Sequence, residues 1–296
     1  MTDADSPKPH LFIFGFGYCA QALAESLMGE GWTVSATCRD TEKQDRLRRS
    51  GIDAHLFDRD RALDGAGRAA LRRSDHLLSS VPPDAAGDPV MDAHAADIRD
   101  GAPYTWIGYL STTGVYGNRD GGEVDETSAL TPSGERGQRR VDAETAWFGL
   151  AAAGPVHSFR LAGIYGPGRN ALETVRQGRA RRVVKPGQVF SRIHRDDVVA
   201  ILRASIARPN AGAAYNCCDD NPAPPQDVIA LACELLGVDP PPEVPFDEAE
   251  LSPMARSFYS DNKLVSNARI KRELGVELRW PDYRNALKSL FQSENT

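Results

Sequence analysis

A short glycine-rich segment near the N-terminus has the residue types and spacing of a phosphate-binding loop. It reads Gly15-Phe16-Gly17-Tyr18-Cys19-Ala20. Gly15 allows a tight turn, Gly17 lets the backbone approach a pyrophosphate, and Ala20 lets a following helix pack closely on the preceding strand. The N–H groups and the positive dipole end at a helix start attract phosphates. The segment predicts a dinucleotide-binding loop, the alternative being a tight strand–helix turn without a ligand.

The residues after the second apolar run indicate which dinucleotide would bind. That run ends in Thr37-Cys38-Arg39-Asp40. The forked guanidinium of Arg39 suits a ribose 2′-phosphate, whereas Asp40 could bond the 2′-hydroxyl of NAD. The two residues could also be a solvated pair that opens the next helix. We favour NADP as the cofactor, with NAD as the alternative. Asp58 ends the third run, where it could bond the adenine amino group or be a polar strand end.

The elements that must position these residues alternate in the way typical of a parallel α/β sheet. Strands are predicted at residues 11–14, 32–37, 54–57, 76–81, 105–110, 156–161 and 213–217. The later helices are predicted at residues 142–150, 196–207, 226–236, 263–274 and 283–291. This pattern predicts an α/β fold with a Rossmann doubly wound parallel sheet. We expect an NAD(P)-binding domain at residues 1–165, with return elements at about 194–218, and a smaller C-terminal substrate domain at 166–296.

Composition narrows the class of partner. The 296 residues carry 35 basic and 41 acidic side chains, a net charge of −6, and a general nucleic-acid binder is usually basic. The five cysteines form no CxxC pair and no cluster with metal-ligand spacing, so no metal site is expected. The start of the chain lacks the features of a signal peptide, and no apolar run is long enough to span a membrane. We therefore expect a cytoplasmic protein with no nucleic-acid or membrane partner.

Five later segments follow one another in a distinctive order. They are Ser79-Ser80-Val81-Pro82, residues 110–117, residues 160–168, residues 192–197 and Tyr215-Asn216. Together they resemble the extended short-chain dehydrogenase/reductase superfamily, the NAD(P)-dependent epimerase/dehydratase group, over almost the whole chain. The resemblance implies a small-molecule substrate that is NDP-sugar-like or otherwise polar, and often a homodimer. It places Ser80, Val81 and Ser111 at the cofactor, and it places Thr113, Arg192 and His194 at the substrate.

The catalytic residues implied by this resemblance are only partly present. The superfamily uses a Ser or Thr after the fifth strand and a Tyr-x-x-x-Lys pair, whose tyrosine moves a proton as hydride passes to nicotinamide. Thr112 matches the first position, but the pair should fall at residues 136–140, which read Arg-Gly-Gln-Arg-Arg. Arg140 could supply a cation near the nicotinamide ribose, yet arginine stays protonated and cannot act as an acid or base. We expect an atypical member.

Two functions fit this combination. In the first, the chain is an NADP(H)-dependent oxidoreductase or epimerase-like enzyme in which Tyr116, Tyr165 or His194 replaces the missing tyrosine, unless these three serve packing or capping. In the second, it is a catalytically silent sensor of NADP(H). A basic stretch is either an anion subsite or a solvated surface. It consists of Arg176, Arg179, Arg181, Arg182, Lys185, Arg192 and Arg195.

Overall fold

The computed structural model describes residues 8–101 and 103–294. Its internal contacts divide the chain into two units. Unit 1 comprises Met1–Ser111, Arg139–Phe159 and Leu202–Ala214, and unit 2 comprises Thr112–Gln138, Arg160–Ile201 and Tyr215–Thr296. The chain therefore passes between the units several times, and residues 112–138 group with the C-terminal part.

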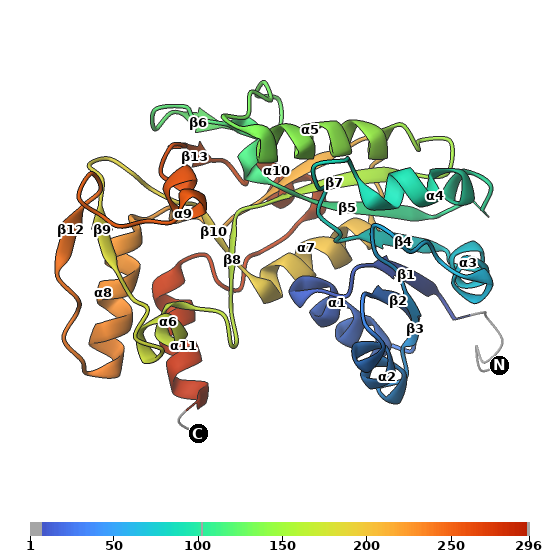
Figure 1. Cartoon of the computed structure of the whole chain (residues 1–296), viewed down its shortest axis with the longest axis horizontal. Helices are drawn as coiled ribbons and strands as arrows, with labels where there is room; N and C mark the ends of the chain where they lie inside the picture. The colour runs from blue at the N-terminus through green and yellow to red at the C-terminus, as the bar shows by residue number, and fades with distance from the viewer. Residues whose placement is uncertain (1–7, 102, 295–296) are drawn as a thin grey trace. The chain divides into compact units, whose positions relative to one another are not determined.

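A seven-stranded sheet contains the strands predicted from the sequence (Figure 1). Its order is β3 (Asp53–Leu56), β2 (Thr33–Cys38), β1 (His10–Phe14), β4 (His76–Ser79), β5 (Trp106–Thr112), β7 (Val156–Leu161) and β11 (Ala214–Cys217). The pairs β1–β2, β2–β3, β1–β4 and β4–β5 are parallel. This order reverses direction between β1 and β4, as in dinucleotide-binding folds. The predicted α/β Rossmann fold is confirmed.

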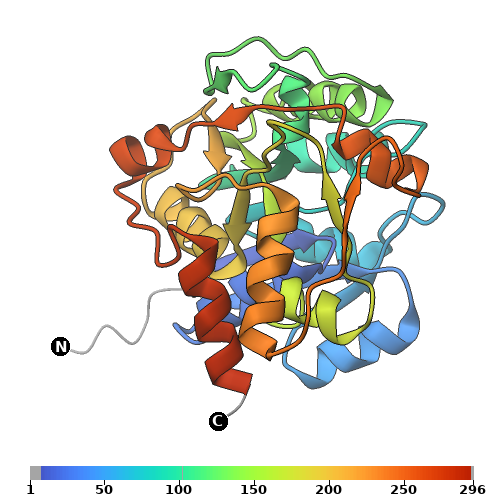
Figure 2. The same cartoon turned by 90° about the vertical axis from the view of Figure 1, so that its left-hand side faces the viewer.

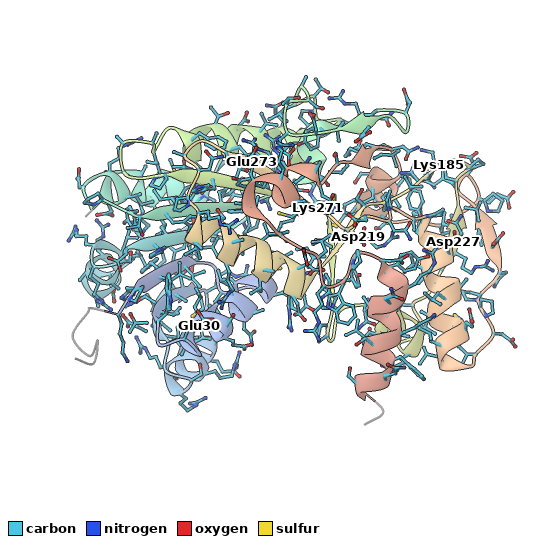
Figure 3. The ribbon with its side chains drawn as sticks, turned by 180° about the vertical axis from the view of Figure 1, so that it is seen from behind. Glu30, Lys185, Asp219, Asp227, Lys271 and Glu273 are labelled. Atoms are coloured by element: carbon cyan, nitrogen blue, oxygen red, sulfur yellow. The ribbon has the colours of Figure 1, made fainter. Side chains whose placement is uncertain are left out.

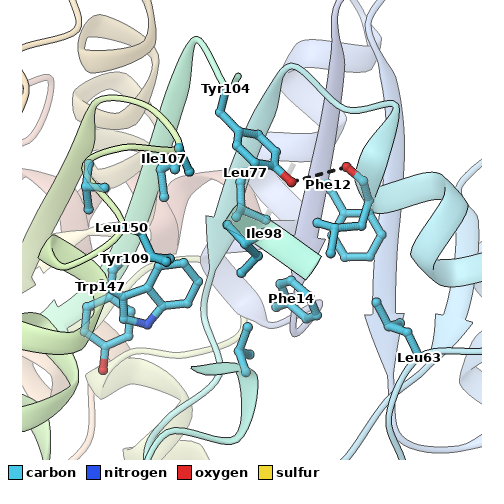
Figure 4. Close-up of a cluster of buried hydrophobic side chains, with 14 of the residues drawn as sticks. Phe12, Phe14, Leu63, Leu77, Ile98, Tyr104, Ile107, Tyr109, Trp147 and Leu150 are labelled. Atoms are coloured by element: carbon cyan, nitrogen blue, oxygen red, sulfur yellow. Dashed lines mark hydrogen bonds between the residues drawn. The ribbon is translucent and has the colours of Figure 1, made fainter. Parts of the chain in front are cut away.

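Successive side chains of a strand point to opposite faces of the sheet. Because the strands are apolar on both faces, helices cover both. Phe12 and Phe14 of β1 join a buried cluster with α3 (Gly65–Arg72), α4 (Pro89–Arg99) and α5 (Glu135–Phe148), shown in Figure 4. Leu11 and Ile13 alternate with them and are fully buried. The remaining helices next to this sheet are α1 (Tyr18–Met28), α2 (Thr41–Arg49) and α7 (Arg195–Ala207).

Unit 2 contains three short parallel strand pairs. They are β8 (Gly163–Tyr165) with β10 (Arg192–His194), β9 (Arg182–Val184) with β12 (Glu243–Pro245), and β6 (Glu123–Val124) with β13 (Leu264–Val265). Its helical elements are η1 (Thr113–Tyr116), α6 (Ala171–Arg176), α8 (Pro225–Leu236), α9 (Pro253–Phe258), α10 (Ala268–Leu274) and α11 (Tyr283–Glu294). Helices α8 and α11 lie side by side (Figure 2) and bury an apolar cluster that includes Tyr165 and Leu172.

Two predicted helices differ from the structure. The helix predicted at residues 142–150 is α5, which begins seven residues earlier at Glu135, and the helix predicted at residues 263–274 is helical only from Ala268. Before that point, Leu264 N–H donates to Gly122 O at 3.1 Å and Ser266 N–H donates to Val124 O at 2.8 Å. These bonds to a distant segment hold residues 264–265 extended.

Candidate functional site

The glycine loop of unit 1 connects β1 to α1 and is held by the neighbouring strand β2. Gly15 N–H donates to Thr37 Oγ1 at 2.8 Å, and Phe16 N–H donates to Thr37 O at 3.0 Å. Gly15 has φ +80°, in the left-handed region that favours glycine. A Cβ there would lie 3.0 Å from Val81 Cγ2 and 3.2 Å from Ser80 Oγ. The loop therefore requires glycine at this position for both its conformation and its packing.

Ser80 and Val81 lie against this loop. Ser80 Oγ donates to Gly15 O at 2.5 Å, which fixes the turn from the side of β4. Gly17 precedes α1 with an extended backbone, no side chain caps that helix, and no acidic residue lies in its first turn. Such a helix start suits a bound phosphate, because the dipole favours an anion there and no carboxylate competes. Tyr18 and Cys19 form this first turn.

Cationic side chains gather at the end of β2, beside the glycine loop. The Arg39 side chain is exposed, and its guanidinium makes no hydrogen bond or ion pair with residues 8–101 or 103–294. Lys43 Nζ donates to Phe16 O at 2.7 Å, within the loop itself. Asp40 instead caps α2, where its Oδ1 accepts from Lys43 N–H at 2.8 Å. The sequence analysis did not single out Lys43. Its position in the first turn of α2, four residues after Arg39, is the signal that could have identified it.

Asp58 forms a local pair with a third cation. Its Oδ2 lies 2.6 Å from Arg61 Nη2, and this hydrogen bond lowers the pKa of the Asp58 carboxyl. The same Arg61 nitrogen donates to Arg39 O at 2.6 Å. The ends of β2 and β3 are thereby joined next to the glycine loop, and Asp58 remains ionised at neutral pH.

Ser111 and Arg140 lie at the end of β5. Ser111 is 4% exposed, and its Oγ has no hydrogen-bond partner in the described part of the chain. Arg140 Nη1 donates to Leu110 O at 2.7 Å, and its guanidinium carbon lies 6.0 Å from the centre of the Tyr109 ring. Since buried hydroxyls nearly always have a partner, the free Ser111 Oγ leaves a polar atom for a ligand at this strand end.

The segment after β5 belongs to unit 2 and contains three predicted site residues. Thr112 Oγ1 accepts from Gly114 N–H at 3.1 Å and caps η1, which begins at Thr113. Tyr116 is fully buried. Its hydroxyl donates to Asn216 Oδ1 at 2.7 Å and accepts from Arg160 Nη1 at 2.9 Å. Burial raises the pKa of Tyr116 to about 12, so its hydroxyl is neutral at physiological pH. Both hydrogen bonds of this hydroxyl are made within the protein.

Tyr165, Arg192 and His194 lie together on the paired strands β8 and β10. The rings of Tyr165 and His194 meet edge to face, with centroids 5.2 Å apart. Burial raises the pKa of Tyr165 and lowers the pKa of His194 to about 4. Arg192 Nη1 donates to Phe190 O at 2.8 Å and to Ala223 O at 2.9 Å. Asp219, which sequence reasoning missed, follows β11, and its N–H donates to Arg192 O at 2.6 Å.

No acid–base pair of the usual kind stands at the start of α5. The Arg136 guanidinium lies 5.9 Å from the centre of the Phe258 ring. The sequence has the spacing Tyr-x-x-x-Lys elsewhere, at Tyr259 and Lys263, but α9 ends at Phe258, so these two residues do not share a helical face. Lys263 Nζ instead donates to Gly117 O at 2.9 Å.

Several side chains of the basic stretch bind locally. Arg176 pairs with Glu173, Arg182 pairs with Glu243, and Lys185 donates to Tyr259 O. For Arg176, Arg182 and Lys185, these contacts favour local binding over a shared anion site. Within residues 8–101 and 103–294, no group of three or more His, Cys, Asp or Glu side chains could hold a metal ion. The same residues contain no helix with the length and apolar character needed to cross a membrane.

No family model matches this chain. A structure of a functionally unknown conserved protein from Silicibacter pomeroyi DSS is 49% identical, covers 98% of this chain and 100% of its own, and has a TM-score of 0.89. Protein YeeZ of Escherichia coli K12 is 29% identical over 283 residues, which cover 91% of this chain and 96% of YeeZ. This chain belongs to the same family as the S. pomeroyi protein.

A more distant structure shares the fold. MoeE5 in complex with UDP-glucose and NAD is 18% identical, covers 97% of this chain and 98% of its own, and has a TM-score of 0.75.

Proposed function

We propose that this chain is a member of the extended short-chain dehydrogenase/reductase superfamily and that it binds a nicotinamide dinucleotide on the loop at Gly15. The observation that carries the proposal is the tight glycine loop between β1 and α1, which requires glycine at position 15 and leads directly into the start of α1. The uncapped start of α1 suits a pyrophosphate, and the unpartnered Ser111 Oγ offers a further polar contact. A bound nicotinamide would accept or donate hydride.

The residues at the end of β2 support NADP over NAD. A 2′-phosphate is negatively charged, so the positive charges of the exposed Arg39 guanidinium and the Lys43 ammonium would attract it. The forked guanidinium also matches the geometry of phosphate oxygens. An NAD-specific site would use a carboxylate for the 2′-hydroxyl. The nearest candidate is Asp40, and the described bond of its carboxylate goes to the backbone of α2.

We expect Arg39→Ala to lower the affinity for NADPH about 10- to 100-fold and to leave the affinity for NADH nearly unchanged. A hydrogen bond to a charged group contributes about 1.5–3 kcal/mol, and only NADPH presents the 2′-phosphate. Fluorescence titration with both cofactors measures the difference. Arg49→Ala is the control, because Arg49 is an exposed arginine at the far end of α2, the helix that begins just after Arg39. Equal weakening of both cofactors, or none, would refute the assignment of NADP.

For the reaction, we propose an oxidoreductase or epimerase-like conversion of a nucleotide-sugar-like or other polar small molecule. The support is the fold shared with MoeE5, whose complex holds UDP-glucose and NAD. Consumption of NADPH, or turnover with internal recycling of the cofactor, on a panel of carbonyl compounds and NDP-sugars tests this. Tight NADPH binding without turnover on the panel would count against it.

One observation favours a second function, a silent sensor of NADP(H). Arg136 stands where the superfamily has its tyrosine, and the hydroxyl of the nearby Tyr116 is occupied by Asn216 and Arg160. A sensor should change its oligomeric state or its partner binding between NADP⁺ and NADPH. Identical sedimentation and partner capture with the two forms would rule it out.

A further inference from the structure

Among the buried polar atoms of unit 2 that have no hydrogen-bond partner in the described residues, four lie in one neighbourhood. They are Tyr165 Oη, His194 Nε2, Asp219 Oδ2 and Trp280 Nε1. The side chains of Tyr165, His194 and Asp219 belong to residues that are 8%, 1% and 2% exposed. Buried polar groups in proteins almost always have partners, so this concentration requires an explanation.

The four side chains are brought together by strand pairing and ring contacts. His194 of β10 stands opposite Tyr165 of β8 in the strand register. The His194 ring also lies 5.4 Å from the Trp280 ring, centre to centre. Asp219 is attached to the same strand through its bond to Arg192 O, and its charge raises the pKa of Tyr165 further beyond the effect of burial. Figure 3 shows Asp219 among the side chains of this unit.

Three of the four atoms are hydrogen-bond donors. His194 Nδ1 accepts from Asp196 N–H at 3.2 Å, and the imidazole is neutral at physiological pH, so its proton lies on Nε2. Trp280 Nε1 can only donate, and Tyr165 keeps its hydroxyl proton because burial raises its pKa. The neighbourhood therefore contains three donor groups, two N–H and one O–H, that have no acceptor among the described residues.

Arg192, a cation without an anionic partner among the described residues, adjoins these donors. Arg192 donates Nη1 to two carbonyl oxygens, but among the described residues no carboxylate lies within ion-pair distance of its guanidinium. Burial lowers the pKa of Arg192, while the nearby charge of Asp219 acts in the opposite direction. A buried cation of this kind is stabilised by an anion at hydrogen-bond distance.

We propose that Tyr165, His194, Trp280 and Arg192 form a binding site for the oxyanion of a small molecule, a carboxylate or a phosphate, taken up together with one proton on Asp219. The proton comes from solvent and converts the Asp219 carboxylate from an acceptor that repels the ligand into a fifth donor. All five residues belong to unit 2, whereas the glycine loop belongs to unit 1.

The charges around Asp219 are consistent with proton uptake near neutral pH. Burial raises the pKa of Asp219 to about 7, and the positive charge of Arg192 opposes this rise. Asp282 and Asp220 also face it, but each has its own partners. Asp282 accepts from Arg284 Nη1 at 2.9 Å, and Asp220 lies 2.5 Å from Lys271 Nζ. Asp219 is thus the carboxyl of this group that lacks a cation within bonding distance.

Isothermal titration calorimetry of the full chain with sodium acetate and with inorganic phosphate tests the proposal. We expect one of these probes to bind with one site per chain, and the arm that binds identifies the class of oxyanion. Uptake of a proton predicts that affinity falls about tenfold per pH unit above pH 7, and that the heat depends on the ionisation enthalpy of the buffer. Absence of binding by both probes in the wild type would overturn the proposal.

Two substitutions and a control locate the binding. Tyr165→Phe removes one unpartnered donor and should weaken binding about tenfold or more. Asp219→Asn should abolish the pH dependence and the proton uptake. Tyr215→Phe, a hydroxyl deletion at another fully buried tyrosine of unit 2, should bind as the wild type does. Melting curves establish that each variant is folded. Unchanged affinity in Tyr165→Phe together with unchanged pH dependence in Asp219→Asn would overturn the site.

NADPH titration of the same wild-type sample separates this proposal from the proposed function. Anion binding without NADPH binding would support the oxyanion site and reject the dinucleotide site. NADPH binding with no response to acetate or phosphate would do the reverse.

Discussion

Replacing Gly15 by alanine is expected to weaken NADPH binding about 100-fold or more and to lower the free energy of unfolding by about 2–3 kcal/mol. The φ of +80° makes any side chain cost about 1–2 kcal/mol. The new Cβ would also lie 3.0 Å from Val81 Cγ2 and 3.3 Å from Val81 N, so the loop must shift. A shift that breaks two charge-assisted bonds to phosphate removes about 3 kcal/mol of binding. Fluorescence titration and denaturant melts measure the two effects.

Gly31→Ala is the matched control for this prediction. Gly31 has φ +88° just beyond the other end of α1, and a Cβ there would meet no atom within 4 Å. The free energy of unfolding of Gly31→Ala should therefore fall only by the cost of a left-handed backbone at alanine, about 1–2 kcal/mol. Its affinity for NADPH should not change. If Gly15→Ala binds NADPH as well as Gly31→Ala does, the loop does not hold the dinucleotide.

The strands of the central sheet could be predicted from the sequence because their signals are local. Each strand is a short apolar run, and the order of runs and helices fixes the fold class. The extended segment Leu264–Val265 could not be predicted, since it pairs with Glu123–Val124, more than a hundred residues away. The first seven residues of α5 could not be predicted for a different reason. Residues 135–142 are mostly charged or glycine, and they lack the apolar periodicity that marks a helix.

The candidate site shows the same division between local and long-range information. Gly15 and Arg39 belong to contiguous motifs, so their positions could be anticipated. Lys43 reaches the loop only because α2 turns its ammonium toward Phe16 O. Asp219 follows an adjacent cysteine pair with no motif of its own, and the fold buries it beside β10. Tertiary burial, which raises its pKa, leaves no mark on the local sequence.

Asp219→Asn is expected to make the protein more stable at neutral and alkaline pH, a large effect for removal of one charge. The pKa of this carboxyl is raised from 3.8 to about 7 by burial. Between these values the native state binds the proton more tightly than the unfolded chain, so the wild type loses stability as pH rises from about 4 to about 7. Below pH 4 the carboxyl is protonated in both states and the loss vanishes. One pKa unit corresponds to about 1.4 kcal/mol, so the full loss is on the order of 4 kcal/mol.

Denaturant melts of wild type and Asp219→Asn at pH 4, 6 and 8, in buffers free of carboxylate and phosphate, measure this difference. The advantage of the variant should grow with pH and level off above pH 7. Asp197→Asn is the contrasting control. That carboxylate is equally buried, but its two oxygens accept from Arg279 N–H at 2.8 Å and Trp280 N–H at 3.1 Å. The asparagine amide keeps only one acceptor oxygen, so we expect the free energy of unfolding of this variant to fall by about 1–3 kcal/mol. A wild-type stability that rises between pH 5 and pH 8 relative to Asp219→Asn would mean that Asp219 is ionised without penalty, because a partner neutralises it in the native state.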